Sequence, residues 1–503
     1  MNPGQAPAVT ISAPIPLVDA AFVSFSPVGV TTVAGRLLQA VSIIDYNTAT
    51  TPVDPTSVLD STNGIQAAHN ALPAGGGALY CPTGTYSVTA LTITKQCMIY
   101  GAGMSTGGTT FKPLNAASNV FTVNVANVSF RDISFNFAIT QTGGSFIKFD
   151  SASSIGVVEN VTMENWWIGI WLNGISNFYI RNVLLTTGVP VSGQGIRVDA
   201  GTAITLDRVF CTNPASGRPL SGITIANCGD VTMMHCSWVQ CVNGCYIAPS
   251  TSQTATSIYG VKCFFDNCGT NGLLIQPQAA SGAAQRMTFA ECWFGSAGSY
   301  GIQIDTTAHA GTVDGITFID PEVVLNGGHG MSLAGSPVNT KIIGGKFAQN
   351  ANAGILINGG VSTIEIMGAT CGNIDNLTGN GTWGIQILTG TTNNLLISNC
   401  RLSGNTSGTI TDASTGSNRR KVDNIGYNPL GTVGITVTGS PFTYTAGDTP
   451  ETVYINGGTL TANITVEGVA AFSPVTPVTV RLNPGKAVVV TYSGAPGMSA
   501  TKD

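Results

Sequence analysis

The amino-acid sequence predicts an all-β protein: a right-handed, single-stranded parallel β-helix with an N-terminal capping helix and a C-terminal β-sandwich-like domain. Three observations support this fold class. A four-residue pattern, glycine–apolar–any–apolar, occurs nine times at intervals of 22 to 30 residues. Apolar residues within the pattern alternate with a period of two, which indicates strands. The segments between copies are rich in Gly, Asn, Thr and Ser, which favour turns.

The copies of the pattern begin at Gly169, Gly195, Gly222, Gly244, Gly272, Gly301, Gly330, Gly354 and Gly384. A repeat of this length is typical of solenoids, in which each coil buries its apolar face against the next coil. A second strand precedes most copies, as in Val209-Phe210-Cys211. We therefore expect about ten or more coils between residues 80 and 420, and we expect right-handed coils because parallel crossovers take that hand.

The composition indicates which classes of partner the chain can have. Charged residues make up only 9%, against about 25% in ordinary soluble domains. Part of this neutral surface is therefore expected to be buried between copies of the chain. The net charge is −5 with no long basic block, which argues against nucleic acid. No apolar run reaches membrane-spanning length, and Met1-Asn2-Pro3-Gly4 does not begin a secretory signal.

Twelve cysteines are present, and five of them recur at a similar point of the coil: Cys211, Cys236, Cys263, Cys292 and Cys400. Stacked coils would align most of these as an interior ladder of small, reduced side chains. His235 and Cys236 are adjacent in a strand and face opposite sides, so they are poorly placed to share a metal ion. We expect neither a metal nor a cofactor.

The chain divides into three parts. Residues 1–42 hold five prolines and few charges, and predict either a strand that covers the first coil or an arm that docks onto a larger assembly. Residues 43–420 form the β-helix, and Arg419-Arg420-Lys421 is expected to be a solvated junction. Residues 421–503 predict a β-sandwich for trimerisation or glycan binding, with strands at 433–437, 451–455, 464–466, 478–482 and 487–492.

The segment from residue 43 to about 112 carries three motifs: Asp60-Ser61-Thr62-Asn63-Gly64-Ile65, Gly75-Gly76-Gly77, and Gly84-Thr85-Tyr86. Ser61 or Thr62 can cap a short helix. The apolar residues that follow share one helix face, and such a helix would plug the open end of a solenoid. The segment resembles the N-terminal signature of the pectate-lyase-like superfamily, in the version shared with bacteriophage tailspikes and polygalacturonase-like proteins.

This resemblance implies a tailspike-like, capsule-depolymerase-like protein of a phage virion. It implies a homotrimer, an attachment of the N-terminal arm to tail proteins, and hydrolysis of a host-surface polysaccharide outside the cell after synthesis in the bacterial cytoplasm. Two alternatives stay open: a fibre or adhesin that only binds glycan, and a uronate lyase or epimerase. Gly328-His329-Gly330 resembles a polygalacturonase motif, but the companion motifs of that family are missing.

The third residue of each copy should point outward, because alternate strand residues face opposite sides. Stacking then predicts one outward column of Trp171, Arg197, Thr224, Tyr246, Leu274 and Gln303. It predicts a neighbouring column of Asn173, Asp199, Ala226, Ala248, Gln276 and Asp305. An aromatic ring, a guanidinium and a carboxylate on adjacent coils suit a sugar, whose hydroxyl or acid groups the charges would fix.

We expect Glu164 and Asp199 to act as the catalytic acids, in a groove floored by Trp166, Trp167 and Trp171. Arg197 is expected to orient the substrate, and Tyr246 to contact it. Asp305 is the reserve acid, because it falls in the same column as Asp199. A second candidate is the acidic segment Asp320-Pro321-Glu322. Three longer loops, 187–194, 213–219 and 249–257, are expected to wall a groove.

Overall fold

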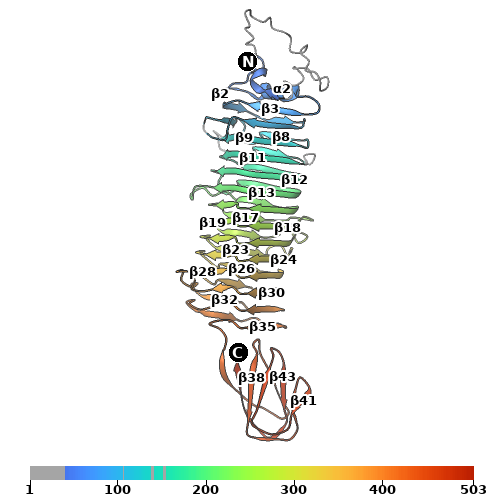
Figure 1. Ribbon diagram of the computed structural model, residues 1–503, viewed down its shortest axis with the longest axis vertical. Coiled ribbons are helices and arrows are strands. Elements are labelled where there is room, and N and C mark those ends of the chain that lie inside the picture. The colour runs from blue at the N-terminus through green and yellow to red at the C-terminus, as the bar shows by residue number, and fades with distance from the viewer. Residues whose placement is uncertain (1–39, 106, 137–140, 151–154, 359) are drawn as a thin grey trace, which may run out of the picture.

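The structure is a computed structural model that describes residues 40–503, except for residues 106, 137–140, 151–154 and 359. A tall stack of parallel strands descends from a helical cap to a separate antiparallel domain (Figure 1). The described residues make about 13 turns of parallel β-helix, so the predicted fold class is confirmed. Most of the predicted arm, residues 1–39, lies outside the described residues. Its last three residues form β1, which pairs with the first coil.

The coils present three sheets, called here faces 1, 2 and 3 in the order in which the chain follows them from each glycine–apolar copy onward, as in β14, β15 and β16. Face 1 comprises β5 (Leu91–Ile93), β8 (Phe121–Val123), β10 (Ile147–Phe149), the first parts of β12 (Ile168–Thr186) and β13 (Gln194–Thr212), β14 (Ser221–Ile225), β17 (Asn243–Ile247), β20 (Asn271–Ile275), β23 (Tyr300–Asp305), β26 (Met331–Ala334), β29 (Ile355–Ile357), β32 (Trp383–Ile387) and β34 (Gly408–Asp412). All pairings between these strands are parallel.

Face 2 comprises β1 (Ala40–Ser42), β3 (Gly77–Cys81), β6 (Cys97–Gly101), the first parts of β9 (Val128–Asn136) and β11 (Gly156–Glu164), the middle of β12 and β13, β15 (Cys228–Met234), β18 (Thr254–Val261), β21 (Ala283–Ala290), β24 (Thr312–Ile319), β27 (Val338–Ile343), β30 (Ser362–Met367), β33 (Leu395–Ser398) and β35 (Arg419–Val422). Face 3 comprises β2 (Thr56–Asp60), β4 (Gly84–Val88), β7 (Thr109–Pro113), the ends of β9, β11, β12 and β13, β16 (Ser237–Val239), β19 (Phe264–Asp266), β22 (Trp293–Gly295), β25 (Glu322–Val324), β28 (Lys346–Ala348) and β31 (Thr370–Cys371).

The corner between faces 2 and 3 has one repeated backbone conformation. Its residue has a positive φ, between 45° and 71°, on twelve successive coils: Asp132, Asn160, Asn182, Arg208, His235, Lys262, Glu291, Asp320, Gly344, Gly368, Asn399 and Asp423. Asn, Asp and Gly adopt this region most readily, which explains why they recur between the strands. The corner turns the chain sharply while the strands on either side keep their register with the next coil.

An asparagine ladder occupies the inward side of the corner between faces 3 and 1. Asn326, Asn350, Asn380 and Asn405 lie on successive coils, and each of the first three donates from its amide nitrogen to the amide oxygen of the next, at 2.8–2.9 Å. The first three side chains are almost fully buried. Each also donates to a backbone carbonyl, as Asn350 does to Val323. The ladder thus satisfies polar groups that burial would otherwise penalise.

Cysteines line the interior as predicted. All twelve are free and buried. Cys236, Cys263 and Cys292 follow the same corner on successive coils, while Cys211 belongs to a second ladder, with its Sγ 3.8 Å from that of Cys241. Burial raises the pKa of the Cys97, Cys228 and Cys268 thiols to about 12. These thiols therefore pack as small apolar groups.

The N-terminal cap is the helix α2 (Thr62–Ala71), which follows the short 3-10 turn η2 (Ile43–Tyr46). Ile65, Ala68 and Leu72 are buried against the first coils, as predicted. Ser61 holds the N-cap position, but its side chain makes no capping bond and instead accepts the Asp54 amide at 2.9 Å. The helix covers the strand edge that the first coil would otherwise expose.

The C-terminal domain packs two four-stranded antiparallel sheets around its own core. One sheet comprises β36 (Gly431–Ile435), β45 (Gly497–Lys502), β38 (Glu451–Asn456) and β42 (Val478–Leu482). The other comprises β37 (Phe442–Thr445), β43 (Ala487–Val490), β40 (Ile464–Val466) and β41 (Val469–Phe472), and the short pair β39 (Thr459–Leu460) and β44 (Tyr492–Gly494) completes the domain. The five strands expected from the sequence are all present.

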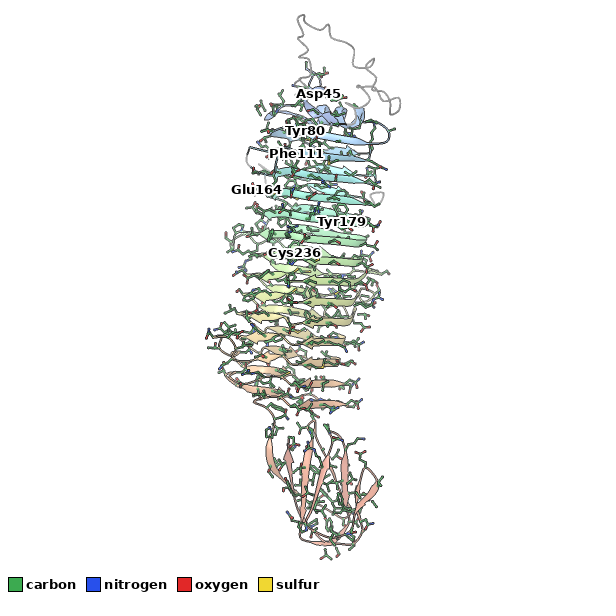
Figure 2. All side chains as sticks on the ribbon, viewed as in Figure 1. Asp45, Tyr80, Phe111, Glu164, Tyr179 and Cys236 are labelled. Atoms are coloured by element: carbon green, nitrogen blue, oxygen red, sulfur yellow. The ribbon has the colours of Figure 1, made fainter. Side chains whose placement is uncertain are left out.

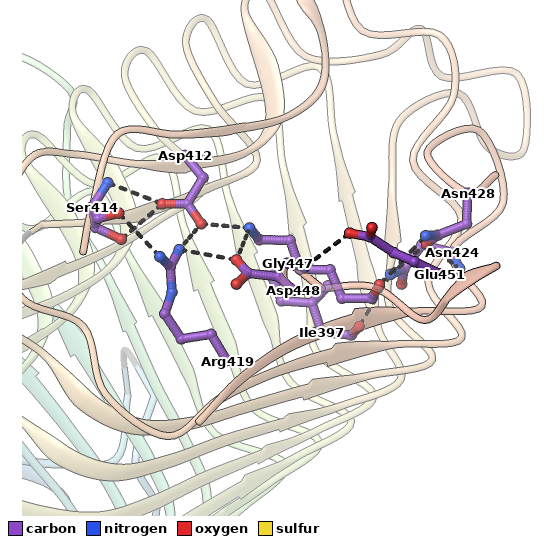
Figure 3. Close-up of polar contacts among 10 residues, drawn as sticks. Ile397, Asp412, Ser414, Arg419, Asn424, Asn428, Gly447, Asp448 and Glu451 are labelled. Atoms are coloured by element: carbon purple, nitrogen blue, oxygen red, sulfur yellow. Dashed lines mark hydrogen bonds and ion pairs between the residues drawn. The ribbon is translucent and has the colours of Figure 1, made fainter. Parts of the chain in front are cut away.

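The junction between the β-helix and this domain is a buried ion-pair cluster. Lys421 bridges Asp412 of the last face-1 strand, at 2.6 Å, and Asp448 of the C-terminal domain, at 2.7 Å. Arg419 also contacts both carboxylates (Figure 3). The Lys421 side chain is only 5% exposed. The expectation of a solvated junction is therefore wrong for Arg419 and Lys421, which belong to the last coil and pair with carboxylates of both domains, whereas Arg420 between them is exposed.

The asparagine ladder predicts a measurable cost for one substitution. In Asn350→Ala, the amide groups of Asn326 and Asn380 lose their shared neighbour inside the coil stack. We expect the free energy of unfolding to fall by about 1–3 kcal/mol, as measured by guanidinium denaturation. The matched control is Asn352→Ala, since Asn352 is exposed in the same turn. Equal losses in the two variants would contradict a role for the ladder.

The buried thiols predict slow chemistry in the native state. Thiolates, not thiols, react with disulfide reagents. Burial keeps the reagent away from all twelve side chains, and it also raises the pKa of several of them, including Cys97, Cys228 and Cys268. We expect a coloured disulfide reagent at pH 8 to label the native protein slowly and the unfolded protein at once. Several disulfide-linked peptides in a non-reducing mass-spectrometric digest would contradict this prediction.

Candidate functional site

Face 1 carries the outward column that the sequence predicts. Strand pairing aligns Trp171 with Arg197, Arg197 with Thr224, and Thr224 with Tyr246. The same register continues to Leu274 and Gln303. Inward neighbours such as Ile170 and Ile196 are fully buried, so the alternation of strand residues separates this column from the core. The prediction of the column is confirmed.

Two cations enclose the indole ring of Trp171. Lys148 Nζ lies 4.6 Å from the ring centroid on the preceding coil, and Arg197 Cζ lies 5.1 Å from it on the following coil. Both distances are typical of cation–π contacts. Because the cations approach from the two neighbouring coils, the faces of the indole ring are occupied. Trp171 therefore orders the two cations and does not offer the open sugar platform that the sequence suggested.

Two carboxylates flank Lys148, Trp171 and Arg197, and the five side chains form one row across face 1. Asp199 accepts a hydrogen bond from Trp171 Nε1 at 2.8 Å and pairs with Arg197 Nε at 2.7 Å. At the other end, Asp150 pairs with Lys148 at 2.8 Å. Asp199 engages Nε of Arg197, which leaves the terminal guanidinium nitrogens for a ligand. The aromatic ring and Asp199 thus fix the direction of Arg197, while Asp150 holds Lys148.

A register shift removes Asp199 from its predicted position beside Asn173 in the second outward column. Leu172 pairs with Val198, but Asn173 pairs with Ala200, so β13 has one extra residue at this point. Asn173 instead donates to Asp150 at 2.6 Å. The predicted alignment of Asn173 with Asp199 is therefore wrong. A β-bulge of this kind redirects a side chain, and it turns Asp199 toward Arg197 and Trp171.

A groove of about 590 Å³ lies across face 1 beside this row. Arg197, Asp199 and Tyr246 all line it. The residues between them, Thr224, Ala226 and Ala248, are small and leave the space open. The rest of the lining is Asn173, Gln194, Ala200, Leu220, Asn227, Ser250 and Gln253. Gln194, Ser250 and Gln253 come from two of the three loops that were expected to wall a groove.

Tyr246 supplies a neutral hydroxyl to this groove. Burial raises the pKa of its phenol above the usual value. The phenol therefore stays protonated at neutral pH and can both donate and accept a hydrogen bond. Arg197 contributes only donors, and Asp199 only acceptors when ionised. The groove thus presents all three kinds of polar partner that a sugar can use.

The structure does not bring the remaining predicted site residues into this groove. Glu164, which is labelled in Figure 2, ends β11 on face 3. There it pairs with Thr186 and accepts a hydrogen bond from Asn136 at 2.7 Å. Asp199 follows the face-1 part of β13. The predicted pairing of Glu164 with Asp199 in one groove is therefore wrong, because a corner of the coil lies between their faces.

The tryptophan cluster is also divided. Trp166 is fully buried, and its ring covers Gly188, where a side chain would clash with it at 2.3 Å. It follows the positive-φ residue Asn165 and so takes an inward position. Its predicted contact with substrate is therefore wrong. Trp167 is partly exposed just before β12, outside the groove lining.

Asp305 lies further along face 1, with its own partners. It accepts from the Thr307 amide at 2.8 Å and from Gln276 at 3.2 Å. It is absent from the groove lining, so its reserve role would need a separate site. Among the described residues, no group of three or more His, Cys, Asp or Glu side chains is placed to hold a metal ion.

Two residues of the row, Lys148 and Asp150, were not found from the sequence. Their coil reads Phe146-Ile147-Lys148-Phe149 and lacks the glycine that marks the other copies. The pairing of Lys148 with Trp171 nevertheless places it in the same column. A search for alternating residues one repeat before Trp171, without the glycine, could have identified it.

The chain shares its architecture with known proteins. The sequence profile described as a right handed beta helix region matches residues 93–318. This chain is a right-handed parallel β-helix. The β-helix resembles a mutant tailspike protein of E. coli bacteriophage HK620 in complex with a hexasaccharide, with a TM-score of 0.55 and 13% identity over 96% of this chain and 97% of that one.

Two further solved structures have the same architecture. The Dettilon tailspike protein gives a TM-score of 0.54 and 13% identity, over 94% of this chain and 96% of that one. The A-module of the Azotobacter vinelandii mannuronan C-5 epimerase AlgE6 gives 0.50 and 17%, over 75% of this β-helix chain and 99% of the module. No curated protein matches in sequence. Within the described residues, no helix has the length and apolar character needed to cross a membrane.

Proposed function

We propose that this β-helix is a tailspike-like receptor-binding protein that holds an acidic host-surface polysaccharide in the face-1 groove. One observation carries the proposal: Arg197 lines the groove with its Nε held by Asp199 and its Cζ over the ring of Trp171. A guanidinium fixed in this way presents its terminal N–H groups as a fork that matches a sugar carboxylate.

The same groove supports recognition of a sugar ring by hydroxyl contacts. Tyr246 stands two coils beyond Arg197, across the short side chain of Thr224. Coils repeat at about 4.8 Å, so the two side chains stand roughly 10 Å apart along the axis. That spacing and the groove volume suit two adjoining sugar residues. Asn173, Gln194 and Gln253 add amide groups that can bond to hydroxyls.

Binding is better supported here than cleavage. Glycoside hydrolysis normally uses two carboxyl groups about 5–9.5 Å apart. Asp199 is the one carboxylate among the residues that line the groove, and it already has two partners. Uronate elimination would need a base, whereas Tyr246 is held neutral. The groove therefore favours the glycan-binding alternative over the hydrolase and lyase alternatives.

The broader assignment to a phage virion rests on the resemblance of the first coils and on the likeness to tailspike folds over nearly the whole chain. In this proposal the N-terminal arm attaches to tail proteins, and the protein acts outside the cell after synthesis in the bacterial cytoplasm. The low charge content and the C-terminal β-domain support a homotrimer.

The arginine gives the direct test of glycan binding. We expect Arg197→Ala to weaken binding to acidic polysaccharides by about tenfold or more, because a charge-assisted pair contributes more than about 1.4 kcal/mol. Alginate, polygalacturonate, hyaluronate and acidic capsular polysaccharides on a carbohydrate array provide the ligands. The matched control is Arg181→Ala, since Arg181 pairs with Glu159 on face 2. Equal affinities in wild type and Arg197→Ala would contradict the proposal.

The products of a long incubation distinguish glycan binding from hydrolysis and from lyase cleavage. We expect bound polysaccharide to show neither new reducing ends nor new ultraviolet-absorbing unsaturation. Reducing ends alone would indicate a hydrolase, and unsaturated ends a lyase. Asp199→Asn should lower affinity by loosening Arg197, and a loss of turnover at unchanged affinity would instead give Asp199 a catalytic role.

The proposed trimer can be tested by measuring the mass of the particle in solution. One chain has a mass of 51.5 kDa, so light scattering should return about three times that value. If the C-terminal domain clamps the chains together, removal of residues 431–503 should convert the trimer into single chains, with the mass of one truncated chain. A single-chain mass for the full-length protein would contradict the trimer.

A further inference from the structure

A second outward column, on face 3, joins aromatic and charged side chains. Pairing aligns Phe210, Ser237, Phe264, Trp293, Glu322 and Lys346 on six successive coils. Phe210 is 43% exposed and Phe264 is 53% exposed. These residues face outward from the same strands whose inward residues, such as Phe265 and Phe294, form the core.

Trp293 does not stand up from this face but lies along its own strand. A side chain at Gly295, two residues further on, would meet Trp293 Nε1 at 2.4 Å and Cε2 at 2.7 Å. The ring therefore covers the space above this glycine. Trp293 Nε1 donates to Asp266 of the preceding coil at 3.2 Å. The ring is thus held flat on the sheet by packing below and by a hydrogen bond at its edge.

Carboxylates lie on both sides of this ring. Asp266 is on the coil before Trp293, and Glu322 is on the coil after it. Asp266 accepts from Trp293 through Oδ1 and from Asn267 through Oδ2, at 2.9 Å. Each oxygen has a further lone pair for another donor. Beyond Glu322, Lys346 pairs with Asp375 at 2.7 Å.

We propose that Phe264 and Trp293 form a second glycan-binding site, which takes a neutral sugar segment and offers Asp266 and Glu322 to its hydroxyl groups. A flat, partly exposed aromatic ring suits the apolar C–H face of a sugar. Ionised carboxylates accept hydrogen bonds from hydroxyl groups and repel sugar acids. The site therefore differs in chemistry from the arginine-containing groove on face 1.

The charges favour a glycan over a protein partner. The central parts of protein interfaces are depleted of Asp and Glu, whereas here Asp266 and Glu322 lie on the coils directly before and after Trp293. A sugar ring can use both kinds of contact at once. This inference extends the proposed function, since it assigns a second subsite to a polysaccharide-binding chain, but it uses a different face and different residues.

The test reports on Trp293 itself. The full-length protein is labelled with 5-fluorotryptophan, and Trp293→Phe assigns the fluorine resonance. Cellohexaose, maltohexaose and a linear mannohexaose are titrated into the millimolar range. We expect a saturable shift of the Trp293 signal with at least one of these probes. The same shift should persist in Arg197→Ala, which separates this site from the face-1 groove.

Two glycine variants provide a matched pair. Gly295→Ala should lift the indole ring and weaken the response by about tenfold or more, although it removes no sugar-contacting atom. Gly229→Ala, on face 2, meets neighbours only at 3.6 Å or more and should leave the response unchanged. Asp266→Asn should also weaken it, because the charged acceptor is lost.

Two results would overturn the inference. The first is an unchanged Trp293 resonance with all three neutral probes. The second is dissociation of the oligomer in Trp293→Ala together with unchanged probe binding measured by isothermal titration calorimetry, which would make this face a contact between chains. If acidic polysaccharides fail to bind while the Trp293 signal responds, the face-1 proposal fails and the face-3 site stands.

Discussion

The vertical hydrogen bonds between coils are the constraint on which this structure depends. Each strand pairs in parallel with the strand one coil before and one coil after it, so a residue shares its direction with its neighbours along the axis. The positive-φ corners let the chain turn without losing this register. Only the ends of the stack leave a strand edge open, and α2 covers the first end while the C-terminal domain adjoins the last.

The fold could be predicted from the sequence because each coil repeats nearly the same order of short strands and turns. The glycine-apolar copies gave the face-1 strands, and the five C-terminal strands were found from their alternation. A face-1 strand does not require this glycine, however. The coil at Phe146-Ile147-Lys148-Phe149 stacks in the same column without it, so a search that depended on glycine missed Lys148 and Asp150.

The site was less predictable, because side-chain direction depends on single irregularities. One extra residue in β13 moves Asp199 out of the predicted column and brings it to Arg197. A positive φ at Asn165 sends Trp166 inward although its neighbour Trp167 stays partly exposed. Neither event changes the periodicity of the strands. The outward column was therefore correct, whereas the catalytic pair that assumed nearby acids on one face was not.

The separation of inward and outward residues has a consequence for how such a surface can change. Inward side chains, from Val41 to Ile410, form one continuous core, while outward residues contact mainly the outward residues of adjacent coils. A substitution at Arg197, Tyr246 or Trp293 alters the surface at one height and leaves the packing beneath it intact. Ligand preference can therefore drift one coil at a time under natural selection, and the scaffold tolerates each step.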